Sequence, residues 1–183
     1  MAMMAIGVVE SNSIPLGVLA GDSMLKAADV QLCTAQTACA GKYIVMVSGQ
    51  VAAVKAAVAA GVESAAATLV DSLVIPNVDE RVIVAMSGAP GIDDAQAVGV
   101  IETFSLASTV SAADTAVKTA EVELIEVRLG RGMGGKSFVV FTGDVSAVEA
   151  AVKAAQAEEG SKGLIGSCVV IPSPHRDMIQ ALL

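Results

Sequence analysis

The cysteines of this chain are its residues best suited to metal or redox chemistry. Cys39 lies in the segment Thr37-Ala38-Cys39-Ala40-Gly41-Lys42, where the glycine lets the backbone approach another group closely. Iron–sulfur clusters require thiolate ligands, but no second cysteine lies at the C-x-x-C spacing typical of a site within one chain. Cys39 therefore needs copies of itself from other chains to hold a cluster, and otherwise it is a small residue in a tight loop. We expect the other two cysteines, Cys33 and Cys168, to be buried in the core.

A glycine-rich segment, Gly130-Arg131-Gly132-Met133-Gly134-Gly135, matches the pattern G-x-G-x-x-G. A dinucleotide site needs a strand before this pattern and a helix after it, so that the helix N-terminus meets the pyrophosphate. Here the strand-like run Lys136–Thr142 follows. We therefore interpret the segment as a connecting loop, in which Arg131 supplies a positive charge.

The remaining candidates for chemistry are a histidine and two lysines. His175 is the only histidine and follows a stiff Pro-Ser-Pro segment near a C-terminal helix, with no serine or cysteine partner evident. Lys26 and Lys118 recur at one helix position, either as solvated residues or as a shared contact. We find no residues arranged for hydrolysis or group transfer, and we expect no enzyme activity.

The composition narrows the classes of partner. The chain has 183 residues, 19 acidic and 11 basic, a formal charge of −8 and 2% aromatic residues, which argues against nucleic acid. Hydrophobic residues make up 54%, yet the longest uncharged stretch is 13 residues, from Gly163 to His175, against roughly 20 needed for a membrane span. We expect neither a membrane span nor a secretory signal, and an oligomer that covers apolar surface. The odd number of cysteines suits a reducing, cytosolic setting.

The sequence contains an internal repeat. Ala5-Ile6-Gly7-Val8-Val9-Glu10 returns as Ala97-Val98-Gly99-Val100-Ile101-Glu102, and residues 5–35 share 12 identities in 31 positions with residues 97–127. Residues 41–58 share 10 identities in 18 positions with residues 135–152, at an offset of 94. The Gly130–Gly135 loop therefore corresponds to the Cys39 loop. The chain is a tandem duplication with a Gly- and Pro-containing joint at residues 87–94, and we predict domains at 1–90 and 95–183.

Both copies predict the same order of elements, βαββαβ, which places the fold in the α+β class with antiparallel sheets and helices. The predicted strands are Ala5–Glu10, Val30–Gln36, Lys42–Ser48 and Leu69–Ile75, then Ala97–Glu102, Val122–Leu129, Lys136–Thr142 and Ile165–Ile171. The predicted helices are Leu16–Ala28 and Val51–Ala66, then Ser108–Ala120 and Val145–Glu158. A duplicated unit can replace two subunits of a six-membered ring, which gives a trimer with pseudo-hexameric symmetry.

The repeated start, the helix Ala20-Gly21-Asp22-Ser23-Met24-Leu25-Lys26 and the ending Val170-Ile171-Pro172-Ser173-Pro174-His175 resemble the bacterial microcompartment shell proteins. The likeness covers both repeats, in the order found in the tandem-domain trimeric members. It is nearest to the cluster-carrying tandem shell proteins of propanediol-utilisation microcompartments, in which the Cys39 loop reads Thr-x-Cys-Pro-Gly-Lys. Ala40 replaces the proline here, Ser173 replaces a frequent basic residue, and Asn77 follows Pro76 without the Pro-His ending.

The resemblance implies a flat homotrimer in a microcompartment shell in the cytoplasm, tiled with hexameric shell proteins. It implies one [4Fe–4S] cluster per trimer, shared by three copies of Cys39 at the threefold pore, which could pass electrons to encapsulated redox enzymes. The pore loops would then comprise Ala38, Ala40, Gly41, Arg131, Gly132, Met133 and Gly134, and the tile edge Lys26, Lys118 and His175. Two alternatives stay open, namely a shell tile with an open metabolite pore and no metal, and a trimeric metabolite-sensing regulator. The enclosed pathway, the cluster's potential and the face that points inward do not follow from the sequence.

Overall fold

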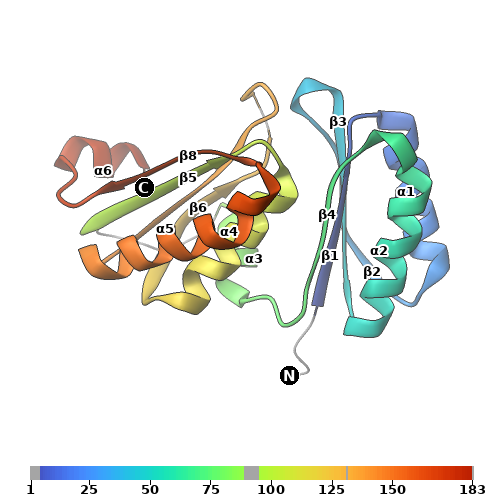
Figure 1. Cartoon of the computed structure of the whole chain (residues 1–183), viewed down its shortest axis with the longest axis horizontal. Coiled ribbons are helices and arrows are strands. Elements are labelled where there is room, and N and C mark those ends of the chain that lie inside the picture. The colour runs from blue at the N-terminus through green and yellow to red at the C-terminus, as the bar shows by residue number, and fades with distance from the viewer. Residues whose placement is uncertain (1–4, 89–94, 131, 183) are drawn as a thin grey trace. The chain divides into compact units, whose positions relative to one another are not determined.

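Two α+β units make up the chain, which a computed structural model describes over residues 5–88, 95–130 and 132–182 (Figure 1). Unit 1 contains residues up to Val78 together with two short segments from later in the chain, Ser105–Ala107 and Gly130–Gly135. Unit 2 contains Asp79–Phe104, Ser108–Leu129 and Lys136 onward. The two later segments in unit 1 are the start of α4 and the glycine-rich loop.

Unit 1 is a four-stranded antiparallel sheet with the strand order β2-β3-β1-β4. Its elements are β1 (Ala5–Ser11), α1 (Ile14–Ala27), β2 (Gln31–Ala38), a 3₁₀ turn (Cys39–Gly41), β3 (Lys42–Gly49), α2 (Val51–Ala65), a 3₁₀ turn (Ala66–Thr68) and β4 (Leu69–Ile75). The predicted hairpin is confirmed, with Ala38 paired to Lys42 beside the turn. Helix α1 begins two residues earlier than expected, because Ser13 caps it and Pro15 suits a first helical turn.

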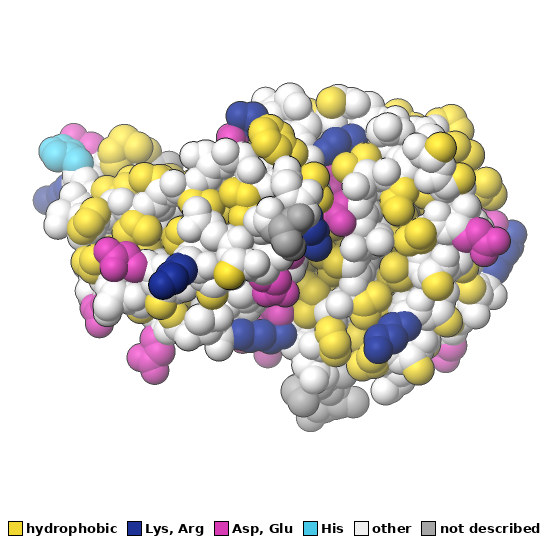
Figure 2. Space-filling view, viewed as in Figure 1, with side chains coloured by type: hydrophobic (Ala, Val, Ile, Leu, Met, Phe, Trp, Pro, Cys, Tyr) yellow, Lys and Arg dark blue, Asp and Glu magenta, His cyan; other side chains and the backbone are white. Residues whose placement is uncertain are grey.

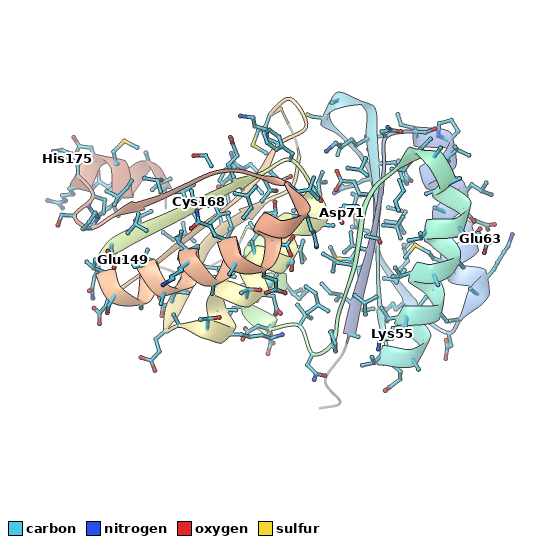
Figure 3. All side chains as sticks on the ribbon, viewed as in Figure 1. Lys55, Glu63, Asp71, Glu149, Cys168 and His175 are labelled. Atoms are coloured by element: carbon cyan, nitrogen blue, oxygen red, sulfur yellow. The ribbon has the colours of Figure 1, made fainter. Side chains whose placement is uncertain are left out.

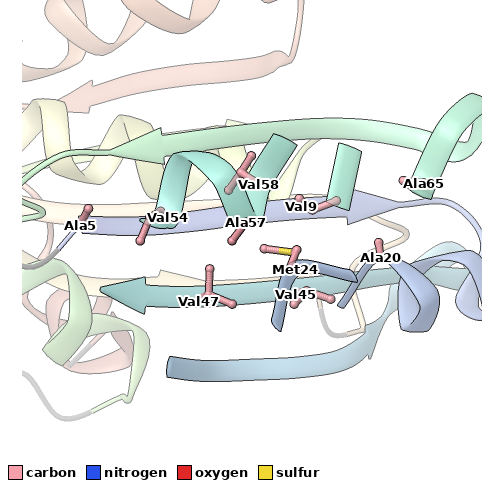
Figure 4. Close-up of a cluster of buried hydrophobic side chains, with 10 residues drawn as sticks. All are labelled: Ala5, Val9, Ala20, Met24, Val45, Val47, Val54, Ala57, Val58 and Ala65. Atoms are coloured by element: carbon pink, nitrogen blue, oxygen red, sulfur yellow. The ribbon is translucent and has the colours of Figure 1, made fainter. Parts of the chain in front are cut away.

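The core of unit 1 lies between the sheet and the helices α1 and α2, which contact β1 and β3 on one face (Figures 1 and 4). Small and β-branched residues fill it around one long side chain, Met24, which is completely buried. The buried cluster comprises Ala5, Val9, Ala20, Met24, Val45, Val47, Val54, Ala57, Val58 and Ala65. Alanine and glycine on the helices therefore let the helices approach the sheet closely. If a large core side chain were removed, these small residues could not fill the space it left.

Within the described residues, one helical stretch, Val51–Thr68, has the length and mean hydropathy, 1.3, of a helix that can cross a membrane. Its inward positions, Val54, Ala57, Val58, Gly61 and Ala65, are buried in unit 1. One such helix is weak evidence for a membrane span, because an apolar core helix of this length passes the same test.

Unit 2 repeats the sheet, in the order β6-β7-β5-β8. Its elements are α3 (Glu80–Met86), β5 (Ala97–Thr103), α4 (Leu106–Thr119), β6 (Val122–Arg128), β7 (Ser137–Gly143), α5 (Val145–Glu159), a 3₁₀ turn (Gly160–Lys162), β8 (Ile165–Ile171) and α6 (Arg176–Leu182). Most of the expected joint between the repeats, residues 89–94, lies outside the described residues. The eight predicted strands and four long helices are confirmed, with each end within two residues of its predicted place.

Helix α3 was not predicted from the sequence. It has seven residues and lies between β4 and the joint, in a stretch for which no element was predicted. Asp79 caps it by accepting a hydrogen bond from the Arg81 N–H, and Val82 and Ala85 are buried where α3 packs against β6 in unit 2. Seven residues make only about two helical turns, which are too few for the spacing of apolar residues to predict a helix.

Candidate functional site

The Cys39 loop is a tight turn between β2 and β3. Ala40 has φ 63° and Gly41 has φ 73°, so two consecutive residues lie in the left-handed region. Glycine adopts this conformation freely, whereas alanine is strained by roughly 1–2 kcal/mol. A proline cannot adopt φ 63°, because its ring fixes φ near −65°. Ala40, which replaces the proline of the similar shell proteins, therefore adopts a left-handed backbone conformation that proline cannot adopt.

The glycine-rich segment packs against this loop within unit 1. The Cys39 N–H donates to the Gly130 carbonyl at 2.7 Å, and the Gly132 N–H donates to Cys39 Sγ. A Cβ atom on Gly130 would lie 3.3 Å from the Cβ of Ala38. On Gly135 it would lie 3.2 Å from the Cβ of Ala40. Because both contacts are tighter than ordinary packing, the glycines permit close approach of the two loops.

The strand β7 follows the glycine-rich segment, where a dinucleotide site needs a helix. This confirms the prediction that a strand follows the segment, as expected for a connecting loop. Of the other predicted pore-loop residues, Ala38 and Met133 are half-buried and Gly134 is exposed. Arg131 lies outside the described residues.

Cys39 opens onto a pocket of about 390 Å³ in unit 1. The pocket is lined by Gln36, Thr37, Ala38, Cys39, Gly130 and Gly132. The thiol is half-buried, and its Sγ accepts a hydrogen bond from the Gly132 N–H. Over the described residues no group of three or more His, Cys, Asp or Glu side chains could hold a metal ion. The loop therefore supplies one soft ligand per chain, which fits a cluster only where several copies converge.

The other two cysteines differ from the expectation. Cys33, predicted to be in the core, is exposed on β2, the edge strand of the first sheet. Its side chain lies on a strand whose first three residues are all exposed, and strand alternation alone does not tell which face is covered. Cys168 is only half-buried on β8 (Figure 3), and burial raises the pKa of its thiol. Because the thiolate is the form that binds metals, this shift disfavours Cys168 as a metal ligand.

The predicted tile-edge residues are surface groups. Lys26 forms an i,i+4 ion pair with Asp22 at 2.6 Å, and Lys118 forms the equivalent pair with Asp114 at 2.5 Å. His175 precedes α6 (Figure 3), with a side chain that is 76% exposed. Each lysine is thus held by an acid one helical turn away, which fixes the direction in which it extends from the helix.

Sequence reasoning missed an ionic cap at α3. Arg81 donates to both carboxylate oxygens of Asp79, at 2.9 and 2.8 Å, and also to the carbonyls of Val117 and Val122. The hydrogen bond from Arg81 lowers the pKa of Asp79, and Asp79 raises the pKa of the Arg81 guanidinium. An Asp two residues before an Arg is too common a pattern to reveal this, because the carbonyls come from residues about 40 positions later.

Comparison with known proteins identifies the family. The model of the BMC domain matches the chain twice, over residues 5–78 and 97–174. This chain belongs to the BMC-domain family. The two matches coincide with the two sheets, so each repeat carries one BMC domain.

Full-length relatives agree with this assignment. The bacterial microcompartment shell protein PduT of Citrobacter freundii is 47% identical over 179 residues, covering 98% of this chain and 97% of that protein. The carboxysome assembly protein CcmO of Synechococcus elongatus is 30% identical, covering 97% of this chain and 68% of that protein. The chain is thus a structural protein of the bacterial microcompartment shell, as the resemblance implied.

Solved structures support the BMC fold. A microcompartment protein from Desulfitobacterium hafniense superposes with a TM-score of 0.84 at 49% identity, covering 98% of this chain and 99% of that one. The fused permuted hexameric shell protein MSM0275 superposes with a TM-score of 0.66 at 20% identity, covering 86% of this chain and 82% of that one. The second likeness shows the fold alone, which is the predicted pair of tandem BMC domains.

Proposed function

We propose that this shell protein is a homotrimeric facet tile that binds one [4Fe–4S] cluster through three copies of Cys39. The observation that carries the proposal is the placement of Cys39 at the apex of a tight turn, half-buried beside a pocket, with an N–H directed at its sulfur. Thiolate is the donor that such clusters require. Three chains related by a threefold axis supply three of these donors, where one chain supplies a single one.

The residues around Cys39 would set the behaviour of the ligand. The N–H of Gly132 stabilises negative charge on the sulfur, and hydrogen bonds to ligand sulfurs shift cluster potentials. The hydrogen bond from the Cys39 N–H to the Gly130 carbonyl fixes the backbone from which the sulfur projects. A cluster bound there supplies one-electron transfer chemistry.

The partners in this proposal are hexameric shell proteins at the tile edge and redox enzymes inside the shell. Lys26, Lys118 and His175 are exposed and lie on or beside α1, α4 and α6, where a neighbouring tile can reach them. Electron microscopy of concentrated protein, alone and with a hexameric shell protein, tests this contact. Discrete particles under both conditions would contradict the tile.

The cluster is tested by anaerobic reconstitution followed by iron and sulfide quantification and visible absorbance. We expect one cluster per three chains in the native sequence and its loss in Cys39→Ser. Cys33→Ser is the matched control, because Cys33 is an exposed thiol on the same strand–turn unit and should leave the iron content unchanged. Iron at background in the native protein, or equal iron in the Cys39→Ser variant, contradicts the cluster.

A further inference from the structure

Lys42 links the Cys39 turn to the glycine-rich loop within unit 1. It is the first residue of β3 and directly follows the turn. Its Nζ donates a hydrogen bond to the Gly135 carbonyl at 3.2 Å and pairs with Glu10 Oε1 at 2.8 Å. Oε2 of Glu10 accepts a hydrogen bond from the Leu106 N–H at 2.8 Å, so both oxygens of this carboxylate are held. Lys42 therefore connects a fixed acid to the end of the loop.

The ammonium of Lys42 is withdrawn from solvent. Its side chain is 12% exposed, and that of Glu10 is 0% exposed. On the face shown in Figure 2, by contrast, basic side chains stand at the surface, several of them beside acidic ones. A buried charge is stable only where it is paired and hydrogen-bonded, and a hydrogen bond from a charged donor is stronger than one between neutral groups. The contact from Lys42 to the Gly135 carbonyl is therefore a strong restraint on the loop.

The glycine-rich loop is held against the Cys39 turn at its start, in its middle and at its end. The Gly130 carbonyl accepts a hydrogen bond from the Cys39 N–H at 2.7 Å, and the Gly132 N–H donates to Cys39 Sγ. At the end of the loop, the Gly135 carbonyl accepts from Lys42. The four glycines of the loop have φ between 51° and 88°. Glycine restricts the backbone less than any other residue, so the position of the Gly132 N–H depends on these contacts.

The end of the loop lies directly against the turn. A Cβ atom on Gly135 would be 3.2 Å from the Cβ of Ala40 and 3.7 Å from the Cys39 carbonyl oxygen. It would also be 3.7 Å from Cε of Lys42, the carbon that carries the ammonium. Gly135 thus lies between the turn and the lysine, and it follows Gly132 by three positions. Loss of the Lys42 contact therefore lets this part of the loop move away from the Cys39 sulfur.

The second repeat has the same pair of charges in a different setting. Lys136 corresponds to Lys42, and it pairs with Glu102 at 3.0 Å, with side chains 45% and 35% exposed. Its Nζ lies 5.8 Å from the centre of the Phe104 ring. The pair in unit 2 therefore lies open to solvent beside an aromatic ring, and Lys136 offers a matched control for Lys42.

We infer that the Glu10–Lys42 pair is a positioning element for the Cys39 ligand. Through the Gly135 carbonyl, Lys42 holds the glycine-rich loop in place, and the loop in turn directs the Gly132 N–H at the Cys39 sulfur. The two charged residues act through the loop. The inference rests on the proposed function, because it concerns the ligand of the proposed cluster, whereas the loop contact itself belongs to the metal-free chain.

The consequence for a bound cluster concerns its reduction potential. An N–H directed at a ligand sulfur stabilises the reduced cluster, which carries one more negative charge than the oxidised cluster. When Lys42 is removed, the Gly132 N–H is no longer held in place, and reduction becomes less favourable. We therefore expect a lower potential with the same thiolate ligands, since Cys39 is retained.

Amide hydrogen exchange in the metal-free full chain, followed by NMR, tests the loop contact directly. The chain has 17 glycines, so isotopic labelling of glycine nitrogen gives few enough signals to resolve, and Gly132→Ala identifies the Gly132 signal. We expect Lys42→Met to speed exchange of this amide about tenfold or more, because a hydrogen bond from a charged group is lost. Lys42→Arg keeps the charge and a donor and should stay within about threefold of the native rate. Lys136→Met should leave the rate unchanged.

A double variant covers the case in which Lys42→Met does not fold. The single substitution leaves the Glu10 carboxylate buried without its ammonium, which is destabilising. Glu10→Gln combined with Lys42→Met removes both charges together with the contact to Gly135, and it should also speed exchange at Gly132 about tenfold or more. If the Gly132 amide exchanges at the native rate in the folded variants, the inference is wrong.

Reconstitution with iron and sulfide separates this inference from the proposed function. Redox titration followed by electron paramagnetic resonance should give a lower potential for Lys42→Met than for the native protein, and a native potential for Lys136→Met. An unchanged potential in Lys42→Met contradicts the positioning role, while the proposed cluster stands. Iron at background in the native protein overturns the proposed cluster, and faster exchange at Gly132 in Lys42→Met then still supports the loop contact.

Discussion

Glu10 and Glu102 occupy the same place in the two repeats, yet Glu10 is fully buried and Glu102 is one-third exposed. Each pairs with a lysine, Lys42 at the start of β3 or Lys136 just before β7, so their local chemistry is alike. The difference is the helix start that Glu10 binds within its own unit. Duplication therefore preserved the acid in both repeats. Only Glu10 accepts hydrogen bonds from a helix start of the other repeat within the same chain.

The two connecting loops show a second divergence. The loop of the first repeat has one thiol and an alanine in the left-handed region, whereas the loop of the second repeat has glycines at four of six positions. The glycine-rich loop contributes backbone donors and acceptors, and the Cys39 loop contributes the reactive side chain. The loop of the first repeat thus supplies the reactive side chain, and the loop of the second repeat supplies hydrogen bonds that hold it.

Glu10→Ala should give the largest difference between the repeats. It leaves Lys42 and the first-turn N–H groups of α4 without their buried carboxylate, which costs about 3–5 kcal/mol. Glu102→Ala acts on a half-exposed pair and should change the unfolding free energy of the monomer by about 1 kcal/mol or less. Urea unfolding of both variants at a concentration where the chain is monomeric compares them. Equal losses of unfolding free energy in the two variants would show that the buried contacts of Glu10 stabilise the chain no more than the exposed pair of Glu102 does.

Met24→Ala tests the cores. Met24 is the longest side chain in the core cluster of unit 1, whereas the equivalent position in α4 is Ala116, also completely buried. The substitution should cost about 2–5 kcal/mol, because the surrounding alanines cannot fill the cavity. Ala116→Met is the reciprocal change and should cost about 1–3 kcal/mol by overpacking. Thermal unfolding measured by circular dichroism checks both, and a stabilising Ala116→Met would contradict the close packing of α4.

The Asp79 cap of α3 should make the free energy of unfolding depend on pH in the acid range. We expect no such dependence from His175, which precedes α6. Arg81 lowers the pKa of Asp79, so this carboxylate contributes stability that is present above its unfolded pKa and lost as the pH falls through its lower folded pKa. Asp79→Asn should therefore flatten the dependence of the unfolding free energy on pH below about pH 4. His175 holds the equivalent place before α6, and His175→Asn should leave that acid range unchanged. Identical acid slopes in the native protein and Asp79→Asn would contradict the role of the cap.

Ala40→Gly should have the smallest effect on the free energy of unfolding. Its sign should be opposite to that of Gly41→Ala in the same loop. Glycine removes left-handed strain at φ 63° but adds freedom to the unfolded chain, so we expect a gain of up to about 1 kcal/mol. Gly41→Ala should lose about 1 kcal/mol at φ 73°. Equilibrium unfolding measures both changes. A loss in Ala40→Gly larger than that in Gly41→Ala would indicate that the loop adopts another backbone.

The sequence alone determined the duplication, the βαββαβ order and the fold class, and it predicted the Cys39 loop as the place for chemistry. These follow from local information, since identities at a fixed offset and the periodicity of apolar residues need no knowledge of distant contacts. The sequence also predicted correctly that a strand follows the glycine-rich loop, because the type of an element depends largely on local residues. It misplaced Cys33, since the alternation of a strand does not tell which face is covered.

Only the tertiary structure decided which duplicated residues are used. Glu10 and Glu102 are indistinguishable in sequence, as are the helix starts at Ser13 and Ser105, and their difference depends on contacts across about 95 residues. The same holds for Cys39, whose sulfur receives an N–H from a glycine 93 positions later. Burial and hydrogen bonding depend on which surfaces meet, and a pattern of residue types along one chain does not contain that information.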